Sequence, residues 1–148
     1  MTEEQIKMSG YQFKLEFEVR DYECDFQGIV NNAIYQNYLE HARHLFLKQC
    51  GIDFIALSKR GIDLVVVRAE IDYLYPLRND DRFYVALNLE RVSRIRFGFL
   101  QDIYRYPDEK PILRARIIGT SLNEVGRPYF PKELEELFEK ASQPEKHQ

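Results

Sequence analysis

Residues 31–51 read NNAIYQNYLEHARHLFLKQCG, and apolar side chains recur through this stretch at helical spacing. The apolar face consists of Ile34, Tyr35, Tyr38, Leu39, Ala42, Leu45 and Phe46. The remaining polar stripe is narrow and consists of Gln36, Glu40, Arg43 and His44. Asn31 and Asn32 are favoured helix caps, and Gly51 is a usual C-terminal stop. The stretch therefore predicts a largely buried helix over about 33–49.

Extended segments lie on both sides of this helix. Before it, FKLEFEVR at 13–20 alternates strictly between apolar and charged residues, which is typical of a half-buried strand. After it come stretches rich in β-branched and aromatic residues, over 63–75, 82–92, 94–106 and 112–123. A last segment, PKELEELFEK at 131–140, has the pattern of a short helix that begins with proline. Short turns between consecutive strands predict antiparallel pairing, so we expect an α+β fold with a sheet wrapped around one helix.

The composition is that of one ordinary globular domain. The chain has 148 residues, of which 45% are hydrophobic and 30% charged, so we expect a single domain over 1–148 with loose ends at 1–10 and 142–148. The formal net charge of -3 argues against a nucleic-acid partner. The N-terminus is acidic and no apolar run is long enough to span a bilayer, which predicts a cytoplasmic protein. Cys24 and Cys50 have neither disulfide nor zinc spacing and are predicted to be reduced thiols.

Three stretches of the chain resemble one family. Residues 19–43, VRDYECDFQGIVNNAIYQNYLEHAR, resemble the N-terminal signature of the 4-hydroxybenzoyl-CoA thioesterase-like branch of the hotdog thioesterases. Residues 68–81, RAEIDYLYPLRNDD, and 126–134, GRPYFPKEL, extend the match over nearly the whole chain. The resemblance implies hydrolysis of an acyl-CoA thioester to free acid and CoA. It also implies the hotdog fold, a curved five-stranded antiparallel sheet around a long helix, and homodimers or homotetramers with active sites at the dimer interface.

The resemblance also assigns roles to residues. Carried over residue by residue, the catalytic aspartate of that family falls on Asp25. A carboxylate can deprotonate a water or attack the thioester carbonyl directly, and the sequence leaves both mechanisms open. The oxyanion needs preorganised donors, which first-turn amides of the helix supply together with the helix dipole. The predicted substrate-binding residues surround this point and are Gly28, Ile29, Val30, Asn31, Asn32 and Tyr35. The scheme requires no metal and no organic cofactor.

Several alternatives stay open. Some family members have a histidine where this chain has Asn32, so a histidine-assisted mechanism is disfavoured here. Glu40 is a second candidate for the catalytic carboxylate, and it has the spacing of an intrahelical ion pair with Arg43. An acyl-CoA or acyl-carrier-protein binding module would keep the fold without acid–base chemistry, which an intact Asp25 disfavours. A hotdog hydratase or dehydratase usually needs a histidine in this region, and the chain has none before His41.

Two further sets of side chains are candidates for holding the rest of the substrate. Arginines that can grip the phosphates of CoA are Arg68, Arg91, Arg94, Arg96, Arg114 and Arg116. Aromatic residues that form the core or line an acyl tunnel are Tyr35, Tyr38, Phe46, Phe97 and Phe99. These residues do not determine the acyl group, the choice between CoA and a carrier protein, or the choice between dimer and tetramer.

Overall fold

The computed structural model describes residues 10–142 of the chain. The predicted loose ends therefore lie outside the described residues, apart from Gly10 and Ser142. In chain order the elements are β1 (Phe13–Glu18), η1 (Asp21–Glu23), α2 (Asn32–Gln49), α3 (Phe54–Lys59), β2 (Asp63–Tyr73), β3 (Arg82–Arg91), β4 (Phe97–Tyr106), β5 (Lys110–Leu122) and α4 (Lys132–Ser142). Within this part of the chain, no helix is both long and apolar enough to cross a bilayer.

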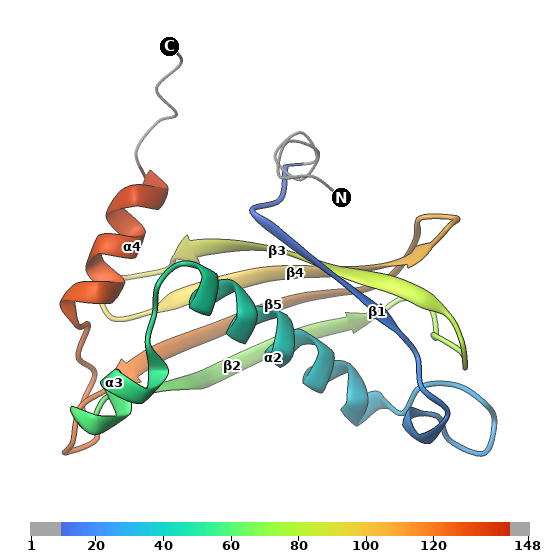
Figure 1. Ribbon diagram of the computed structural model, residues 1–148, viewed down its shortest axis with the longest axis horizontal. Helices are drawn as coiled ribbons and strands as arrows, with labels where there is room; N and C mark the ends of the chain where they lie inside the picture. Colours follow the sequence, from blue (N-terminus) through green and yellow to red (C-terminus); the bar gives the residue numbers. More distant parts are fainter. Residues whose placement is uncertain (1–9, 143–148) are drawn as a thin grey trace, which may run out of the picture.

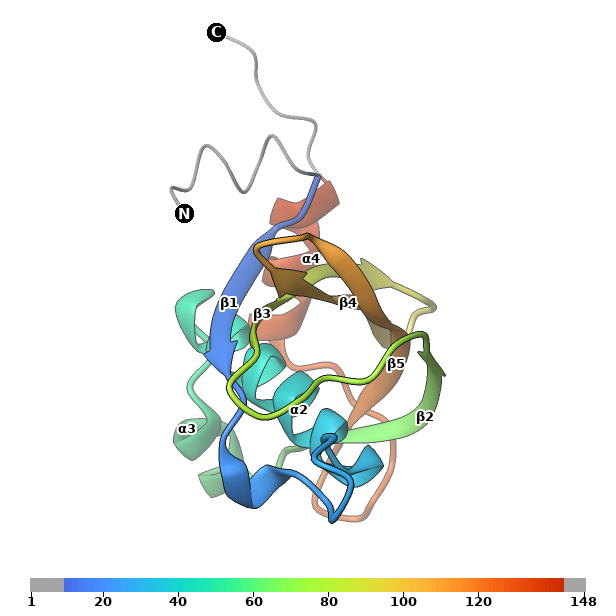
Figure 2. The ribbon, with the colours of Figure 1, turned by 90° about the vertical axis from the view of Figure 1, so that its right-hand side faces the viewer.

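The five strands form one antiparallel sheet in the order β1-β3-β4-β5-β2. The sheet is curved, and α2 lies in its hollow (Figures 1 and 2). The shorter helices α3 and α4 lie at the end of the sheet where α2 ends (Figure 1). An ion pair between Arg60 and Glu133 links the two, at 2.5 Å. The predicted α+β fold, with a curved antiparallel sheet around a long helix, is confirmed.

Helix α2 forms where the hydrophobic spacing predicts it. Asn31 is the N-cap, and its side-chain oxygen accepts the backbone N–H of Ala33 at 3.2 Å. At the other end Gly51 takes a positive φ of 90°, which ends the helix. The buried face consists of Tyr35, Tyr38, Leu39, Ala42, Phe46 and Leu47. It packs on inward side chains of the central strands, including Phe83, Val85 and Leu87 of β3.

The observed elements differ from the predicted ones mainly in two places. Helix α3 falls between the predicted central helix and the strand predicted from residue 63, where the sequence predicted no element. Asp53 caps it by accepting the N–H of Ala56 at 3.0 Å. Its six residues are too few for hydrophobic periodicity to show. Strand β4 begins at Phe97 instead of 94, because Ser93 and Arg96 form the tight turn after β3.

Strand β2 is an edge of the sheet and pairs only with β5 among the described strands. Its register shifts between Val66 and Arg68, which marks a β-bulge. Large apolar side chains stay uncovered along and just beyond this edge, with Val66 52%, Val67 45% and Tyr73 47% exposed. An uncovered apolar edge of this kind is a surface on which another strand can pair.

Candidate active site

Asp25 lies in a short loop that is closed by its own hydrogen bonds. The backbone N–H of Asp25 donates to Ile29 O at 2.9 Å, and Gly28 N–H donates to Asp25 O at 3.0 Å. Gly28 has a φ of 77°, which favours glycine at this turn. The side-chain oxygen Oδ1 of Asp25 accepts from the backbone of Gln27 at 2.8 Å and of Ile29 at 3.4 Å. Both of these bonds fall on Oδ1, which leaves Oδ2 as the oxygen available to a water or a substrate.

The rest of the fold holds this loop in place. Val30 N–H donates to Leu77 O at 2.9 Å, and both side chains are buried in the core. Isolated bridges join Cys24 to Val30 and Ile29 to Arg78. The Asp25 carboxylate is exposed at the surface, but the loop that carries it is fixed at both ends.

The N-terminus of α2 follows within a few residues of Asp25. The Asn31 side chain caps Ala33 N–H, and Ile34 N–H donates to Asn31 O at 2.9 Å. As the first helical residue, Asn32 has no intrahelical acceptor for its own N–H. That free amide lies at the positive end of the helix dipole, so it is suited to bind a developing negative charge.

Four of the predicted substrate-binding residues meet at this end of α2. Ile29, Val30, Asn32 and Tyr35 line a small cavity of about 160 Å³. Its other wall is the segment after β2, which consists of Tyr73, Leu74, Tyr75 and Pro76. Gly28 and Asn31 lie next to this cavity in the chain but do not line it. The structure thus brings most of the predicted set together, while their contact with a substrate stays a prediction.

Tyr35 has a structural role that the sequence did not indicate. It is only 3% exposed, and its hydroxyl oxygen accepts the backbone N–H of Leu77 at 2.9 Å. Its ring packs edge-on against Tyr73, with the ring centroids 5.6 Å apart. Burial raises the pKa of the Tyr35 phenol, which therefore stays neutral. Tyr35 fixes the segment from β2 to Leu77 against α2.

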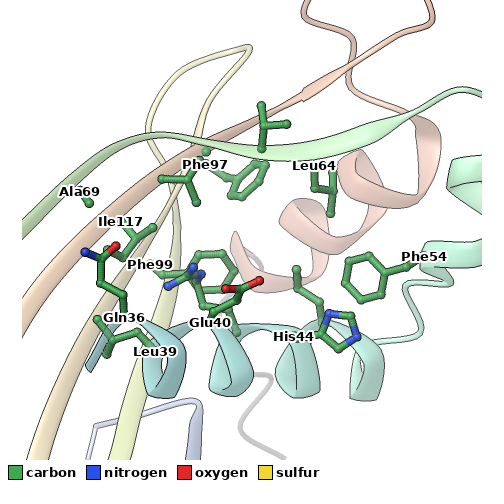
Figure 3. A pocket seen from close by; sticks show the side chains of 15 residues that line it. Gln36, Leu39, Glu40, His44, Phe54, Leu64, Ala69, Phe97, Phe99 and Ile117 are labelled. Atoms are coloured by element: carbon green, nitrogen blue, oxygen red, sulfur yellow. The ribbon is translucent and has the colours of Figure 1, made fainter. Parts of the chain in front are cut away.

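A second cavity, of about 370 Å³, lies farther along α2 between the helix and the sheet (Figure 3). The helix side is lined by Gln36, Leu39, Glu40, Arg43, His44 and Leu47. The facing wall is largely apolar and includes Phe54, Leu64, Ala69, Phe97, Phe99 and Ile117. All four residues of the predicted polar stripe therefore line this cavity. Phe97 and Phe99 were candidates from the sequence, whereas no sequence signal pointed to Phe54 or Leu64.

Arg43 is held by a buried glutamine. Its Nη1 donates to Oε1 of Gln101 at 3.0 Å, and Nε2 of Gln101 donates to the backbone oxygen of Leu39 at 3.0 Å. Burial lowers the pKa of the Arg43 guanidinium, while the nearby Glu40 carboxylate acts in the opposite direction. The sequence suggested an ion pair between Glu40 and Arg43, but none forms within 4.0 Å between these two described residues.

Neither a cysteine nucleophile nor a metal site is favoured by the structure of residues 10–142. Burial raises the pKa of the Cys24 thiol, and the neighbouring carboxylate of Asp25 raises it further. Because the thiolate is the reactive form, this supports an unreactive thiol. Among residues 10–142 no group of three or more His, Cys, Asp and Glu side chains is arranged to hold a metal ion.

Three of the six candidate arginines form ion pairs. Arg68 pairs with Glu70 at 2.8 Å, Arg91 with Glu135 at 2.7 Å and Arg116 with Glu90 at 3.0 Å. Arg94 and Arg96 lie exposed in the turn between β3 and β4. Binding of nucleotide phosphates by any of these arginines stays a prediction.

Comparisons of this chain with known proteins agree with one another. Residues 19–141 match the family described as the thioesterase-like superfamily. The chloroplastic acyl-acyl carrier protein thioesterase ATL2 of Arabidopsis thaliana is 39% identical over 115 residues, which cover 78% of this chain and 61% of that protein. A protein of Aquifex aeolicus named as an esterase is 39% identical over 120 residues, covering 81% of this chain and 92% of that protein.

The fold is also that of a solved thioesterase. The crystal structure of Slr0204, a 1,4-dihydroxy-2-naphthoyl-CoA thioesterase from Synechocystis, aligns with a TM-score of 0.80 at 21% identity. The alignment covers 89% of this chain and 98% of that one. The predicted hotdog fold is thereby confirmed. The chain spans only about three fifths of the length of the plant relative, as the 61% coverage shows.

Proposed function

Because this chain belongs to the thioesterase-like superfamily, we propose that it hydrolyses acyl thioesters with Asp25 as the catalytic carboxylate. One observation carries the proposal. An exposed carboxylate, held through Oδ1 only, lies in a closed loop that leads directly into the N-terminus of α2, where the amide of Asn32 is free. A nucleophile or base and an oxyanion donor are therefore contributed by neighbouring parts of one chain.

In the hydrolysis, the Asn32 N–H binds the thioester oxygen as it becomes negative. Oδ2 of Asp25 takes a proton from a water, and the water oxygen forms a bond to the carbonyl carbon. The carbon–sulfur bond then breaks, and the proton passes from Asp25 to the departing thiolate. Direct attack by Oδ2 is the other route, in which water resolves a mixed anhydride. Either route consumes one water and releases a free acid and a thiol.

The carrier of the acyl group is either CoA or a carrier protein. The resemblance of the signature at 19–43 favours CoA, while the Arabidopsis relative is named for acyl-acyl carrier protein. Acyl-CoA is the substrate that we propose to test first. The cytoplasm stays the predicted compartment of this chain.

We also propose that the protein works as a homodimer through the β2 edge. Val66 and Val67 of the bulge, together with Tyr73, Leu74 and Tyr75, are each close to half exposed or more. Pairing of two β2 edges would cover these side chains and satisfy free backbone groups. The same step would bring the Tyr73 to Pro76 wall of the small cavity close to the second copy. A homotetramer would need a further contact between such dimers.

The test is release of free thiol from acyl-CoAs of different length, measured for the natural protein and for Asp25→Asn. Asparagine keeps an Oδ1 that can accept the same two backbone hydrogen bonds, so the loop stays intact. We expect kcat to fall by about 100-fold to 10,000-fold, the range for loss of a positioned base. Asp21→Asn is the matched control, because Asp21 lies in the same loop region and its Oδ1 also accepts a backbone N–H, from Tyr22 at 2.8 Å.

The outcomes separate the alternatives. Full activity of Asp25→Asn would move the catalytic role to Glu40, a carboxylate on the wall of the larger cavity. Tight binding of acyl-CoA without turnover by the natural protein would support the binding-module alternative instead.

A further inference from the structure

Phe97 and Gly119 form a close pair on the wall of the larger cavity. They are directly opposite each other on β4 and β5, so both point to the same face of the sheet. A Cβ at Gly119 would lie 2.8 Å from both Cε2 and Cζ of the Phe97 ring, and 3.0 Å from the carbonyl oxygen of Val65. The tip of the ring therefore occupies the place that the side chain of any larger residue would need. Glycine in a strand interior often marks such a close approach.

The ring of Phe97 is backed by aromatic side chains that α4 helps to hold. Its centroid lies 5.9 Å from that of Phe99, 6.1 Å from Phe130 and 6.4 Å from Phe138. The Arg91 guanidinium lies over Phe130 at 4.9 Å and over Phe138 at 5.4 Å. These contacts close the space behind Phe97, so the free side of its ring is the cavity.

The two cavities lie in series along the groove between α2 and β2. Asn32 and Tyr35 face Tyr73 in the small cavity, whereas Leu47 lines the large cavity together with Leu64. Helix and strand therefore run in opposite directions on the two sides of one groove. At roughly 1.5 Å per residue, the lining residues Gln36 and Leu47 lie about 6 Å and about 22 Å along the helix from Asn32.

An acyl chain whose carbonyl is held at Asn32 would enter the large cavity along α2. The 370 Å³ of this cavity would hold about a dozen methylene-sized groups, at roughly 30 Å³ for a group the size of a water. Figure 3 shows Phe97 and Phe99 on the sheet side of the cavity, across from Glu40 of α2, with Leu64, His44 and Phe54 farther along.

We propose that Phe97, seated on Gly119, narrows the acyl channel from the sheet side and so sets the longest unbranched acyl chain that the enzyme accepts. The proposal rests on the proposed thioesterase function and adds its length specificity. Substrates of short to medium chain length should fill the channel, and longer chains should meet the ring. The two residues act on the acyl chain away from the thioester, so they determine which chains bind and not how the thioester is cleaved.

Two substitutions should move the limit in opposite directions. Gly119→Ala places a methyl group where the ring lies, so the ring must turn into the cavity and shorten the channel by about two methylene groups. Phe97→Leu removes ring atoms and should lengthen the accepted chain by a similar amount. For chains past the limit, each methylene left outside should lower kcat/KM by about fourfold. The double variant Gly119→Ala/Phe97→Leu should return the limit towards that of the natural protein.

Gly98→Ala is the matched control. Gly98 is a buried sheet glycine beside Phe97, and as the next residue in the strand it points to the opposite face. A Cβ there would meet the end of the flexible Glu90 side chain and Val92, each at 3.0 Å, and not the cavity. Its chain-length profile should match that of the natural protein. Circular dichroism melting checks that each variant is folded, and Phe97→Met replaces Phe97→Leu if the latter is not.

The experiment measures kcat/KM for saturated acyl-CoAs from four to sixteen carbons, and binding of the matching non-hydrolysable thioether analogues by calorimetry. A folded Gly119→Ala whose profile keeps its shape, or loses activity equally at all lengths, would overturn the proposal. If no thioester is hydrolysed but the thioethers show opposite shifts in the two variants, the channel limit stands and the thioesterase function fails. If hydrolysis occurs without any change in length preference, the function stands and the channel limit fails. Absence of both hydrolysis and binding refutes both.

Discussion

Replacing Gln101 by leucine should destabilise the protein by about 2–3 kcal/mol, the cost of leaving a charged donor without its buried partner. Gln101 is 0% exposed on β4 and is the side-chain partner that accepts from Arg43, at 3.0 Å. The Gln101 side chain also donates a hydrogen bond to Leu39 O. Loss of this second bond costs less, because the carbonyl oxygen of Leu39 keeps its hydrogen bond within the helix. For a domain of this size the melting temperature should fall by about 4–12 °C.

Urea unfolding followed by circular dichroism gives the free energy of unfolding for Gln101→Leu, Arg43→Met and the double variant. Arg43→Met leaves the buried Oε1 of Gln101 unpaired, so it should also destabilise the protein. The double variant removes both polar partners and should cost at least about 1 kcal/mol less than the sum of the single changes. Single effects that add within about 0.5 kcal/mol would refute the idea that this hydrogen bond couples α2 to β4.

The remaining predictions concern the β2 edge, the Tyr35 hydroxyl and the anchoring of α4. Val67→Lys should convert the proposed dimer to monomers in light scattering, while Val125→Lys, at a residue that is 76% exposed outside the edge, should not. Tyr35→Phe removes the acceptor of the buried Leu77 N–H and should lower the free energy of unfolding by about 1–3 kcal/mol in urea titrations, whereas an unchanged midpoint would contradict that role. The hydrogen bonds from Arg91 lower the pKa of Glu135 below its ordinary 4.5, so the stability from this pair is present at neutral pH and is lost as the pH falls through the lowered pKa. The melting temperature of Arg91→Met should therefore depend less on pH in this acidic range than that of the natural protein, and equal slopes would count against the pair.

The long elements could be predicted because their patterns extend over many residues. Helix α2 shows its apolar face over five turns, and the strict alternation at 13–20 matches β1 (Phe13–Glu18). Helix α3 could not be predicted, because six residues show too little periodicity and its Asp53 cap resembles an ordinary turn aspartate. The sequence pattern of β2 also does not predict the bulge at Val66, because the bulge depends on how β2 pairs with β5.

The larger cavity escaped prediction for a different reason. Gln36, Glu40, Arg43 and His44 share one helix face, and a polar stripe of this kind usually faces solvent. Periodicity shows which residues share a face but not what lies opposite, and here the opposite wall is part of the sheet. Asp25 could be proposed because the resemblance assigns it, whereas the Oδ1 bonds that hold its carboxylate are visible only in the structure.

The two ends of the proposed channel depend on different kinds of interaction. The Asp25 end is built from backbone hydrogen bonds within a closed loop and a helix cap, which tolerate little change in geometry. The Phe97 end is built from side-chain packing, which a single methyl group can alter. Asp25→Asn should therefore lower kcat by the same factor for every chain length, because the change lies at the thioester end of the substrate and not among the side chains that line the larger cavity. Measuring this fall in kcat for short and long acyl-CoAs tests whether the two ends of the channel act independently. A factor that varies with chain length would mean that the position of the chain end alters the alignment of the thioester with Asp25.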